Sequence, residues 1–499
     1  MEALATTERA AVPPRRDDEL EARLELELPA QLAVGLGNAI FVYGSCFHRR
    51  RRVTDLRILV GGRSIEPMAQ AMPRLDLYRR HPRAYRSAFW AIVPLAPDLG
   101  RGAIELSVVA SLDDGDEVVA DLAKLELGPA PADGAEGSDR DGDPGASRVA
   151  ICMATHNPTP ELFQRQVESI REQTHPNWVC MISDDHSDPE AFAEIEAVVS
   201  ADPRFQLSRA PHHLGFYRNF ERALSMAPTD AAFVALADQD DRWRPEKLET
   251  LIGEIGDAQL AFSDARVIAA DGAPLSETYW SRRRPNHSNL ASLLISNTVT
   301  GAASLFRRSL LDRVLPFPTE LGTQWHDHWV ALVALASGRI RYVDRPLYDY
   351  VQHADAVLGH VAANPRRQRR STIERAQMLR EDWRAAFGGW CWKYFYGVCR
   401  MLLVARVLDL RCGRELRGRK RRALRWFAAI DRTPLGYVWI SLRRLRRLVG
   451  LNETGGEERL FLHGLAWHRI IALLTWRRRR PLAKLNKDAS LPREWPHSR

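Results

Sequence analysis

The stretch Ala231–Asp241, with the sequence AAFVALADQDD, constrains the fold of this chain more than any other feature. Its first part contains only Ala, Val, Leu and Phe, and a short uncharged run of this kind predicts a fully buried strand of a mostly parallel sheet. The run ends in Asp238, Asp240 and Asp241, and ligands of open α/β sheets bind beyond the carboxyl ends of the strands. Clustered carboxylates repel one another unless a cation lies between them, so the stretch predicts a metal site. The alternative is a polar loop in which one aspartate caps the next helix.

Strands and helices alternate before this stretch. Strands are expected at 148–156, 178–185 and 205–210, and helices at Glu161–Gln173, Glu190–Ser200 and Phe216–Met226. Such alternation predicts right-handed βαβ units and a parallel sheet. The first strand is not followed by GxGxxG and the chain lacks GxxxxGK[ST], so neither a dinucleotide site nor a P-loop is expected.

Composition divides the chain into five parts. Short strands separated by turn residues between about 35 and 126 predict a small β-sandwich. The run GPAPADGAEGSDRDGDPGAS has no large apolar residue and predicts a flexible linker. We therefore expect a disordered lead-in at 1–30, a β-sandwich at 31–127, a linker at 128–147, an α/β catalytic domain with a mostly parallel mixed sheet at 148–362, and a basic helical region at 363–499.

Charge is unevenly distributed along the 499 residues. Residues 361–499 contain 33 Lys and Arg against 11 Asp and Glu, a net charge of +22, whereas the first 360 residues carry −14. This asymmetry predicts an anionic partner, and basic amphipathic helices with Trp at their edges favour an anionic membrane surface. Nucleic acid is disfavoured because no motif that binds it occurs, and a helical bundle with a solvated basic face is the structural alternative.

Three features predict the location. The N-terminus lacks the apolar core of a secretory signal. Six scattered cysteines without a CxxC pair suit a reducing cytosol. The most apolar stretch, Arg459–Trp476, is interrupted by His463, His468 and Arg469, which argues against a spanning helix. We expect a cytoplasmic protein that is peripheral at the cytosolic face of the plasma (inner) membrane.

Polar residues also follow the other expected strands of the sheet. They are Thr155 and Asn157 after the first strand, Asp185 after the second, and Gly215, Arg218 and Asn219 after the third. A carboxylate can accept hydrogen bonds from a base or a ribose, and an Arg and a helix N-terminus can face a diphosphate. A metal between the diphosphate and Asp240 would offset the remaining charge. This set of residues at one sheet edge predicts a nucleotide site.

Seven motifs in order resemble the family 2 glycosyltransferases, which have the glycosyltransferase A fold. They span roughly 148–360 and read ATHNP, ISDDHSD, HLGFYRNFERAL, LADQDDRWRPEKL, TGAASLFRR, WHDHWVALVA and YVQHADAVLG. The similarity is greatest to the rhamnosyltransferase-like group of bacterial cell-surface glycan assembly. The segment with VYGSCF, LRILVGGR and AFWAIVPL resembles β-sandwich modules that precede some bacterial glycosyltransferases. The QxxRW motif of processive synthases is absent, which favours a non-processive transfer.

The resemblance implies a role for each matching residue. Nucleotide-sugar contacts are expected from Thr155, Asn157, Asp185 (the base), Gly215, Arg218, Asn219 and Asp238 (the ribose or sugar). Asp240 and His353 are expected to bind Mg²⁺ or Mn²⁺, although a lone His is usually not a ligand. Asp327 is expected to be the general base that deprotonates the acceptor hydroxyl; the alternative is an aspartate that only stabilises a helix N-terminus.

These expectations combine into an inverting, metal-dependent glycosyltransferase. It would move a sugar, a hexose and in one option rhamnose, from a nucleoside-diphosphate sugar to a lipid-linked or polysaccharide acceptor in cell-surface glycan synthesis. Two other classes stay open: a nucleotidyltransferase that acts on sugar phosphates, and a non-catalytic scaffold that binds glycan or membrane.

Overall fold

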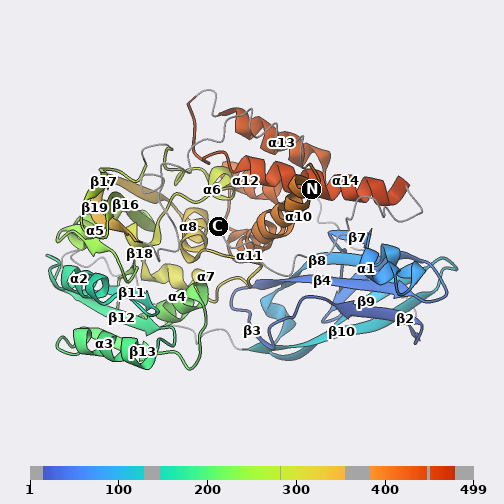
Figure 1. Cartoon of the computed structure of the whole chain (residues 1–499), viewed down its shortest axis with the longest axis horizontal. Helices are drawn as coiled ribbons and strands as arrows, with labels where there is room; N and C mark the ends of the chain where they lie inside the picture. Colours follow the sequence, from blue (N-terminus) through green and yellow to red (C-terminus); the bar gives the residue numbers. More distant parts are fainter. Residues whose placement is uncertain (1–14, 129–146, 281–282, 354–382, 447–449, 478–499) are drawn as a thin grey trace.

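The computed structural model describes residues 15–128, 147–280, 283–353, 383–446 and 450–477. Three parts lie side by side: a β-sandwich in blue, a mixed α/β part in green and yellow, and a group of helices in orange and red (Figure 1). The expected linker lies outside the described residues except for its two ends.

The N-terminal part consists of two facing sheets. One has the strand order β1-β10-β9-β5-β6 with β3 paired to β10, and the other has the order β2-β4-β8-β7. The elements are β1 (Arg15–Arg16), β2 (Leu20–Leu24), β3 (Gln31–Ala33), β4 (Asn38–His48), β5 (Val53–Val60), β6 (Arg63–Ile65), β7 (Ala69–Met72), α1 (Leu75–Tyr78), β8 (Ala88–Leu95), β9 (Gly102–Leu112) and β10 (Glu117–Gly128). Alternate residues of β8 face opposite sides: Phe89 and Ala91 join the core between the sheets, whereas Trp90 joins the core shared with the C-terminal helices.

The sandwich begins earlier than expected. Residues 1–30 were expected to be a disordered lead-in, but β2 pairs antiparallel with β4, from Leu20 opposite His48 to Leu24 opposite Gly44. Leu20 is also part of the sandwich core. The charged sequence of this segment concealed a strand that has only one face to bury. The first 14 residues lie outside the described part of the chain.

The α/β part is built on a nine-stranded mixed sheet with the order β13-β12-β11-β14-β18-β16-β19-β15, and with β17 paired to β16. The strands are β11 (Val149–Thr155), β12 (Trp178–Asp184), β13 (Phe205–Arg209), β14 (Phe233–Ala237), β15 (Arg242–Trp243), β16 (Leu260–Ala269), β17 (Pro274–Ser276), β18 (Ser304–Arg307) and β19 (Ile340–Gln352). Pairing is parallel from β13 through β12 and β11 to β14, and antiparallel between β14 and β18. The predicted mixed α/β fold with a buried central strand is confirmed.

Helices connect these strands. They are α2 (Pro160–Arg171), α3 (Pro189–Val199), α4 (Phe216–Ser225), α5 (Lys247–Ile255), α6 (Leu290–Leu293), α7 (Leu311–Val314) and α8 (His326–Ser337). Because β11, β12 and β14 are parallel neighbours, their carboxyl ends meet at one sheet edge. Asp238 therefore lies at the same edge as Thr155 and Asp185.

The C-terminal helices are α10 (Trp383–Lys393), a π-helical turn at Tyr394–Cys399, α11 (Arg400–Cys412), α12 (Gly418–Ala428), α13 (Pro434–Leu445) and α14 (Glu458–Arg477). They are part of the protein core rather than an appendage. Arg411 of α11 donates to the carbonyl of Gly37 in the sandwich (2.8 Å) and to that of Arg313 in the α/β part (2.9 Å). Trp90 Nε1 donates to the hydroxyl of Tyr394 (3.0 Å).

Among the helices that the structure describes, none is long and apolar enough to cross a membrane. α14 has the required length, but its polar and basic residues keep its hydropathy too low.

Candidate active site at the carboxyl edge of the sheet

The acidic residues after β14 are held by the residue between them. Gln239 Oε1 accepts from the backbone N–H of His156 (2.8 Å), and Gln239 Nε2 donates to the carbonyl of His156 (3.2 Å). The amide side chain thus continues the pairing of β14 with β11 beyond the last strand residues. This clamp leaves Asp238 and Asp240 half-buried at the sheet edge.

A two-residue strand brings His353 to the same place. β15 pairs antiparallel with β19, with Arg242 opposite Asp349. Since β19 ends at Gln352, the next residue lies beside the acidic stretch that precedes β15. His353 Nε2 lies 2.7 Å from Asp240 Oδ2, so the structure brings together the two residues that were expected to bind metal.

Asp241 is the third carboxylate of the predicted metal-binding stretch, and the family resemblance gives it no separate role. It is fully buried, and its Oδ1 accepts from the N–H of Val351 (3.3 Å), while Oδ2 has no partner within the described residues. Burial, followed by repulsion from Asp240 and Asp238, raises the pKa of Asp241 well above its usual range. Because one oxygen of this buried carboxyl lacks a partner, its ionised form is costly, and Asp241 favours the protonated form.

Lys247 lies behind this cluster. It is fully buried, donates from Nζ to the carbonyl of Ala302 (2.5 Å) and lies 3.2 Å from the centre of the Trp243 ring. Burial lowers the pKa of Lys247 well below its usual range, although Asp241 and Asp238 act in the opposite direction. The acidic edge therefore lacks full compensation by this lysine.

Asp238 and Asp327 influence one another across the edge. Burial raises the pKa of Asp238 to about 7, and the charges of Asp240 and Asp327 add to this effect. Asp327 comes from the first turn of α8, and Asp238 from the end of β14. The expected base and the expected sugar-binding carboxylate thus belong to one electrostatic cluster.

Asp327 is half-buried and hydrogen-bonded. Its Oδ1 accepts from the N–H of His328 (2.6 Å). Burial raises the pKa of Asp327 to about 6, against the opposing effect of hydrogen bonds from the His328 and Gly301 backbone and the Asn297 side chain. This carboxylate is ionised at pH 7 but remains a better proton acceptor than an exposed aspartate.

Asp185 holds the loop that precedes α4. Its Oδ1 accepts from Leu214 N–H (2.5 Å) and its Oδ2 from Gly215 N–H (2.9 Å). Gly215 has φ +84°, and a Cβ added to it would meet no atom within 4 Å, so its backbone faces open space in a conformation that favours glycine. The structure therefore brings Asp185 and Gly215 into contact.

Thr155 and Asn219 belong to a buried network behind the edge. Thr155 Oγ1 donates to Asp184 Oδ1 (3.2 Å), and Asn219 Nδ2 donates to the carbonyls of Thr155 (3.2 Å) and Ser183 (2.9 Å). Both side chains are about 1% exposed. Their polar groups tie α4 to the ends of β11 and β12, so they position the edge.

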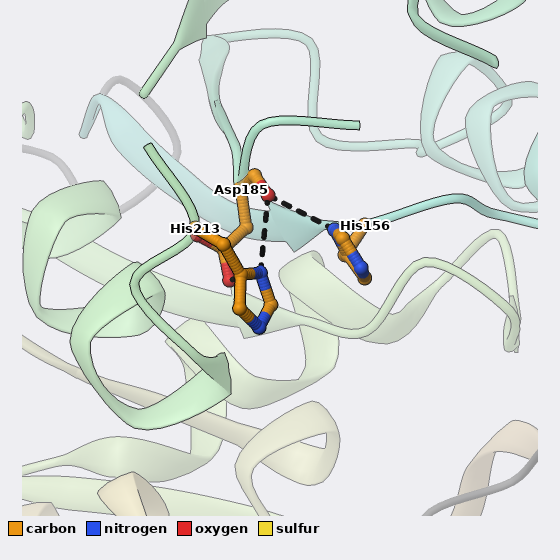
Figure 2. Close-up of side chains that lie close together, drawn as sticks. All are labelled: His156, Asp185 and His213. Carbon is orange, nitrogen blue, oxygen red and sulfur yellow. Dashed lines mark hydrogen bonds and ion pairs between the residues drawn. The ribbon is translucent and has the colours of Figure 1, made fainter. Parts of the chain in front are cut away.

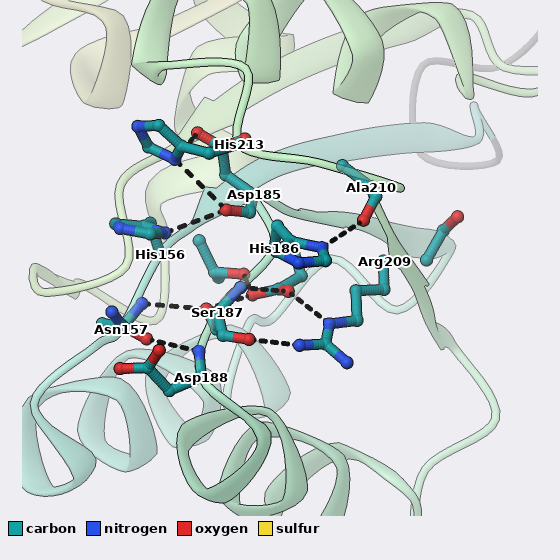
Figure 3. Close-up of polar contacts among 12 residues, drawn as sticks. His156, Asn157, Asp185, His186, Ser187, Asp188, Arg209, Ala210 and His213 are labelled. Atoms are coloured by element: carbon teal, nitrogen blue, oxygen red, sulfur yellow. Dashed lines mark hydrogen bonds and ion pairs between the residues drawn. The ribbon is translucent and has the colours of Figure 1, made fainter.

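Asn157 and Arg218 contact neighbouring loops. Asn157 has φ +40°, and its Oδ1 accepts from Asp188 N–H (2.9 Å) in the loop drawn in Figure 3. Arg218 donates to Glu221 (2.6 Å), Glu320 (2.9 Å) and the carbonyl of Pro318 (3.1 Å). These bonds direct its guanidinium to residues 318–320.

The aromatic residues around Asp327 separate into core and surface. His326 stacks on Phe220 with ring centres 3.6 Å apart, and burial lowers its pKa to about 3. Trp329 is 2% exposed and donates to the carbonyl of Val314 (2.8 Å). Trp325 is only half-buried and lies 5.1 Å from the ring of Phe216, so it is the tryptophan that can contact a ligand.

Comparison with known proteins gives a consistent assignment. Residues 150–315 match the family described as "Glycosyl transferase family 2". Protein CgeD of Bacillus subtilis is 26% identical over 202 residues, which cover 36% of this chain and 43% of CgeD. TuaG of the same organism, whose name provisionally assigns it to teichuronic acid biosynthesis as a glycosyltransferase, is 29% identical over 131 residues, covering 26% of this chain and 51% of TuaG. This chain spans about half or less of these curated relatives.

Solved structures with a similar chain include residues 1–349 of TarS from S. aureus (TM-score 0.36, 16% identity, 57% of this chain and 91% of that chain). TarS has also been solved in complex with UDP-GlcNAc. A second is the mannosyltransferase PcManGT from Pyrobaculum calidifontis in complex with GDP-Man and Mn²⁺ (TM-score 0.33, 16% identity, 68% of this chain and 91% of that chain).

Proposed function

We propose that this protein is an inverting, metal-dependent glycosyltransferase, because residues 150–315 match the family described as "Glycosyl transferase family 2". It transfers a sugar from a nucleoside-diphosphate sugar to a lipid-linked or polysaccharide acceptor in cell-surface glycan synthesis. The observation that carries the proposal is the group of carboxylates at the carboxyl edge of the sheet, where Asp240 Oδ2 lies 2.7 Å from His353 Nε2 and the charges of Asp240 and Asp327 act on Asp238. A donor site, a cation site and a base are all needed there, and these carboxylates supply each of them.

The donor lies along the edge from Asp185 to Asp238. Asp185 takes the base, and Gly215 allows the nucleotide to approach the N-terminus of α4, which is ten residues long. Thr155 and Asn219 fix the backbone of the pocket through their buried hydrogen bonds. Arg218 acts indirectly, because its guanidinium is bound to residues 318–320.

The residues at the end of β14 fit a hard divalent cation, Mg²⁺ or Mn²⁺. Asp240 and His353 would hold it, and Asp241, whose Oδ2 has no partner among the described residues, adds a third carboxyl group nearby. When bound, the cation neutralises the charge that develops on the departing nucleoside diphosphate.

Asp327 removes the proton. The acceptor hydroxyl oxygen forms a bond to the anomeric carbon on the side opposite to the diphosphate, and its proton passes to the Asp327 carboxylate. The bond from the anomeric carbon to the diphosphate oxygen breaks, and the nucleoside diphosphate leaves with the electron pair. Asp238 orients the donor sugar or ribose, so its distance from Asp327 determines the line of attack.

A donor screen tests this proposal. Thermal unfolding of the full chain is followed with UDP-, GDP-, dTDP- and CDP-sugars, each in Mn²⁺ and in EDTA. We expect one nucleotide class to raise the midpoint in Mn²⁺ only, because a ligand that binds only the folded state stabilises it. Release of pyrophosphate from a sugar phosphate and a nucleoside triphosphate would instead identify a nucleotidyltransferase. Donor binding with no transfer to any acceptor would favour a scaffold.

The C-terminal helices provide the proposed membrane contact. Nine of the eleven exposed large apolar side chains among the described residues lie between Trp426 and Leu473. Four of them, Leu435, Val438, Leu442 and Leu445, follow one another at helical spacing on α13 and are 50–59% exposed. α13 lies at the outer edge of the molecule (Figure 1). An apolar helical face within a region of net charge +22 suits the plane of an anionic membrane.

We expect the triple variant Leu435→Gln, Val438→Gln and Leu442→Gln to lose flotation with anionic liposomes. Buried leucine side chains contribute on the order of 1.5–3 kcal/mol each, and basic residues near the surface about 1 kcal/mol each. Wild type should float with anionic vesicles at low salt, and less so at high salt or with neutral vesicles.

The control is Leu36→Gln with Leu275→Gln, two exposed leucines outside the C-terminal helices. This double variant should float like wild type. A truncation before α11 is unsuitable, because α11 is buried in the core. If wild type does not float with anionic vesicles at low salt, the membrane proposal is wrong, and α13 binds another protein or no partner.

A further inference from the structure

Two histidines flank Asp185 at the carboxyl edge of the sheet. His156 follows β11, and His213 lies in the loop before α4; both rings approach Asp185 from different elements (Figure 2). His156 Nδ1 is 2.9 Å from the Asp185 carbonyl oxygen, and His213 Nδ1 is 3.1 Å from Asp185 Oδ2. The ring centres of the two histidines are 4.6 Å apart.

The three side chains supply potential ligand atoms at close range. One atom from each residue, a ring nitrogen from His156 and His213 and an oxygen from Asp185, all lie within 4.8 Å of one another. The ligands of a tetrahedral Zn²⁺ are about 3.3 Å apart, which follows from Zn–ligand bonds of about 2.0 Å. Both histidines are exposed, so their rings have room to rotate toward this spacing.

The carboxylate and the backbone of this cluster are held in place. Asp185 is 1% exposed and accepts from the N–H groups of Leu214 and Gly215. The backbone of His156 is clamped at both its N–H and its carbonyl by Gln239. Metal sites need ligands whose orientation is fixed by such surrounding bonds.

We propose that His156, Asp185 and His213 form a binding site for a borderline transition metal of the Zn²⁺ class, distinct from the carboxylate site at Asp240. Imidazole suits Zn²⁺, Co²⁺ and Ni²⁺, whereas Mg²⁺ and Mn²⁺ favour oxygen ligands. The three protein ligands leave a fourth position for solvent or a ligand. The site at Asp240 has one imidazole, His353, whereas this site has two imidazoles and one carboxylate, so the two sites favour different ions.

Occupation of this site affects the donor, in so far as the proposed function holds. The base of the nucleotide and the metal would both use Asp185, so they compete. Binding of His213 to the metal also fixes the loop whose N–H groups donate hydrogen bonds to Asp185. Zn²⁺ at this site therefore inhibits by competing with the nucleotide. This inhibition is separate from the requirement for Mn²⁺ or Mg²⁺ at the other site.

The binding test uses the full chain and no donor. Zn²⁺ affinity is measured by competition with a chromophoric chelator, and Co²⁺ is titrated in parallel while its visible ligand-field absorption is recorded. We expect one Zn²⁺ per chain, and His156→Ala and His213→Ala should each weaken it by about tenfold or more and remove the Co²⁺ bands. His212→Ala, an exposed histidine beside the cluster, should bind like wild type.

Two results would overturn the site: no one-to-one Zn²⁺ complex in wild type, or affinities of His156→Ala and His213→Ala equal to that of His212→Ala. Since both substituted side chains are exposed, circular dichroism and the thermal midpoint should stay unchanged and show that each variant is folded. The competition is then measured by donor affinity with and without Zn²⁺. A protein that binds Zn²⁺ but no donor would contradict the proposed function and leave the metal site standing.

Discussion

Asp327→Asn should lower turnover by about 10²–10⁴-fold, the usual contribution of a general base, while the affinity for the donor stays near that of wild type. The asparagine keeps the size of the side chain and can still accept from His328 N–H. It cannot accept the proton of the acceptor hydroxyl. Single-turnover transfer and a separate donor titration measure the two quantities.

The pH profile gives the same prediction a second readout. With the pKa of Asp327 raised to about 6 by burial, the carboxylate is ionised above this value and protonated below it. Turnover of wild type should fall about tenfold per pH unit below 6, because only the ionised form accepts a proton. Asp327→Asn should lack this acid limb.

The stability of the Asp327→Asn variant shows whether a loss of turnover comes from catalysis or from folding. The folded-state pKa of Asp327 lies above its unfolded value, so the folded state binds more protons between about pH 4 and 6. Its ionisation therefore costs stability as pH rises through this window, and Asp327→Asn should be at least as stable as wild type at pH 8. Asp312→Asn, an exposed aspartate also in the first turn of a helix, is the matched control. If turnover of Asp327→Asn is within a few-fold of that control, Asp327 is not the general base and only stabilises the N-terminus of its helix.

The spacing of apolar residues in the sequence predicted the architecture of the α/β part. β14 at Phe233–Ala237 lies within the stretch predicted as a buried strand, and α4 at Phe216–Ser225 nearly coincides with the expected helix. Uncharged runs and 3.6-residue spacing are properties of single segments, so the sequence carries them locally. β2 was missed because a strand that buries one face is hard to distinguish from a charged coil.

The site was less predictable, because side-chain partners come from distant segments. Gln239 had no predicted role, yet its amide clamps His156. Arg218 was expected to face the nucleotide, but its partners Glu320 and Pro318 are about a hundred residues away in the sequence. No pattern within α4 signals that contact.

Asp241 and Lys247 show the same limit for charge. Asp241 was predicted only as one of three clustered carboxylates, and Lys247 had no predicted role. The packing of β19 and of the Ala302 segment buries both residues, and the sequence does not show this. Val351 of the YVQHADAVLG motif lies in an apolar cluster with Leu162 and Ile268. The remainder of the YVQHADAVLG motif, from Ala354, lies outside the described residues.

Asp240→Ala should abolish the part of donor binding that depends on Mn²⁺, so that affinity in Mn²⁺ falls to the value in EDTA. His353→Ala should weaken it by about ten- to a hundredfold, the range for groups that support a metal site. The reason is the 2.7 Å approach of His353 Nε2 to Asp240 Oδ2, which lets one cation contact both. Calorimetric titration of the donor in Mn²⁺, Mg²⁺ and EDTA measures each affinity.

The metal-free protein supplies the decisive control for this experiment. Asp240 repels Asp238 and Asp241, so without metal the alanine variant should unfold at the same temperature as wild type or higher. Mn²⁺ should raise the midpoint of wild type and of Asp312→Ala, but not that of Asp240→Ala. A variant that binds the donor with unchanged affinity and unchanged Mn²⁺ dependence would remove Asp240 from the metal site. The repulsion among the three carboxylates would then be relieved by protonation, in line with the raised pKa values of Asp238 and Asp241.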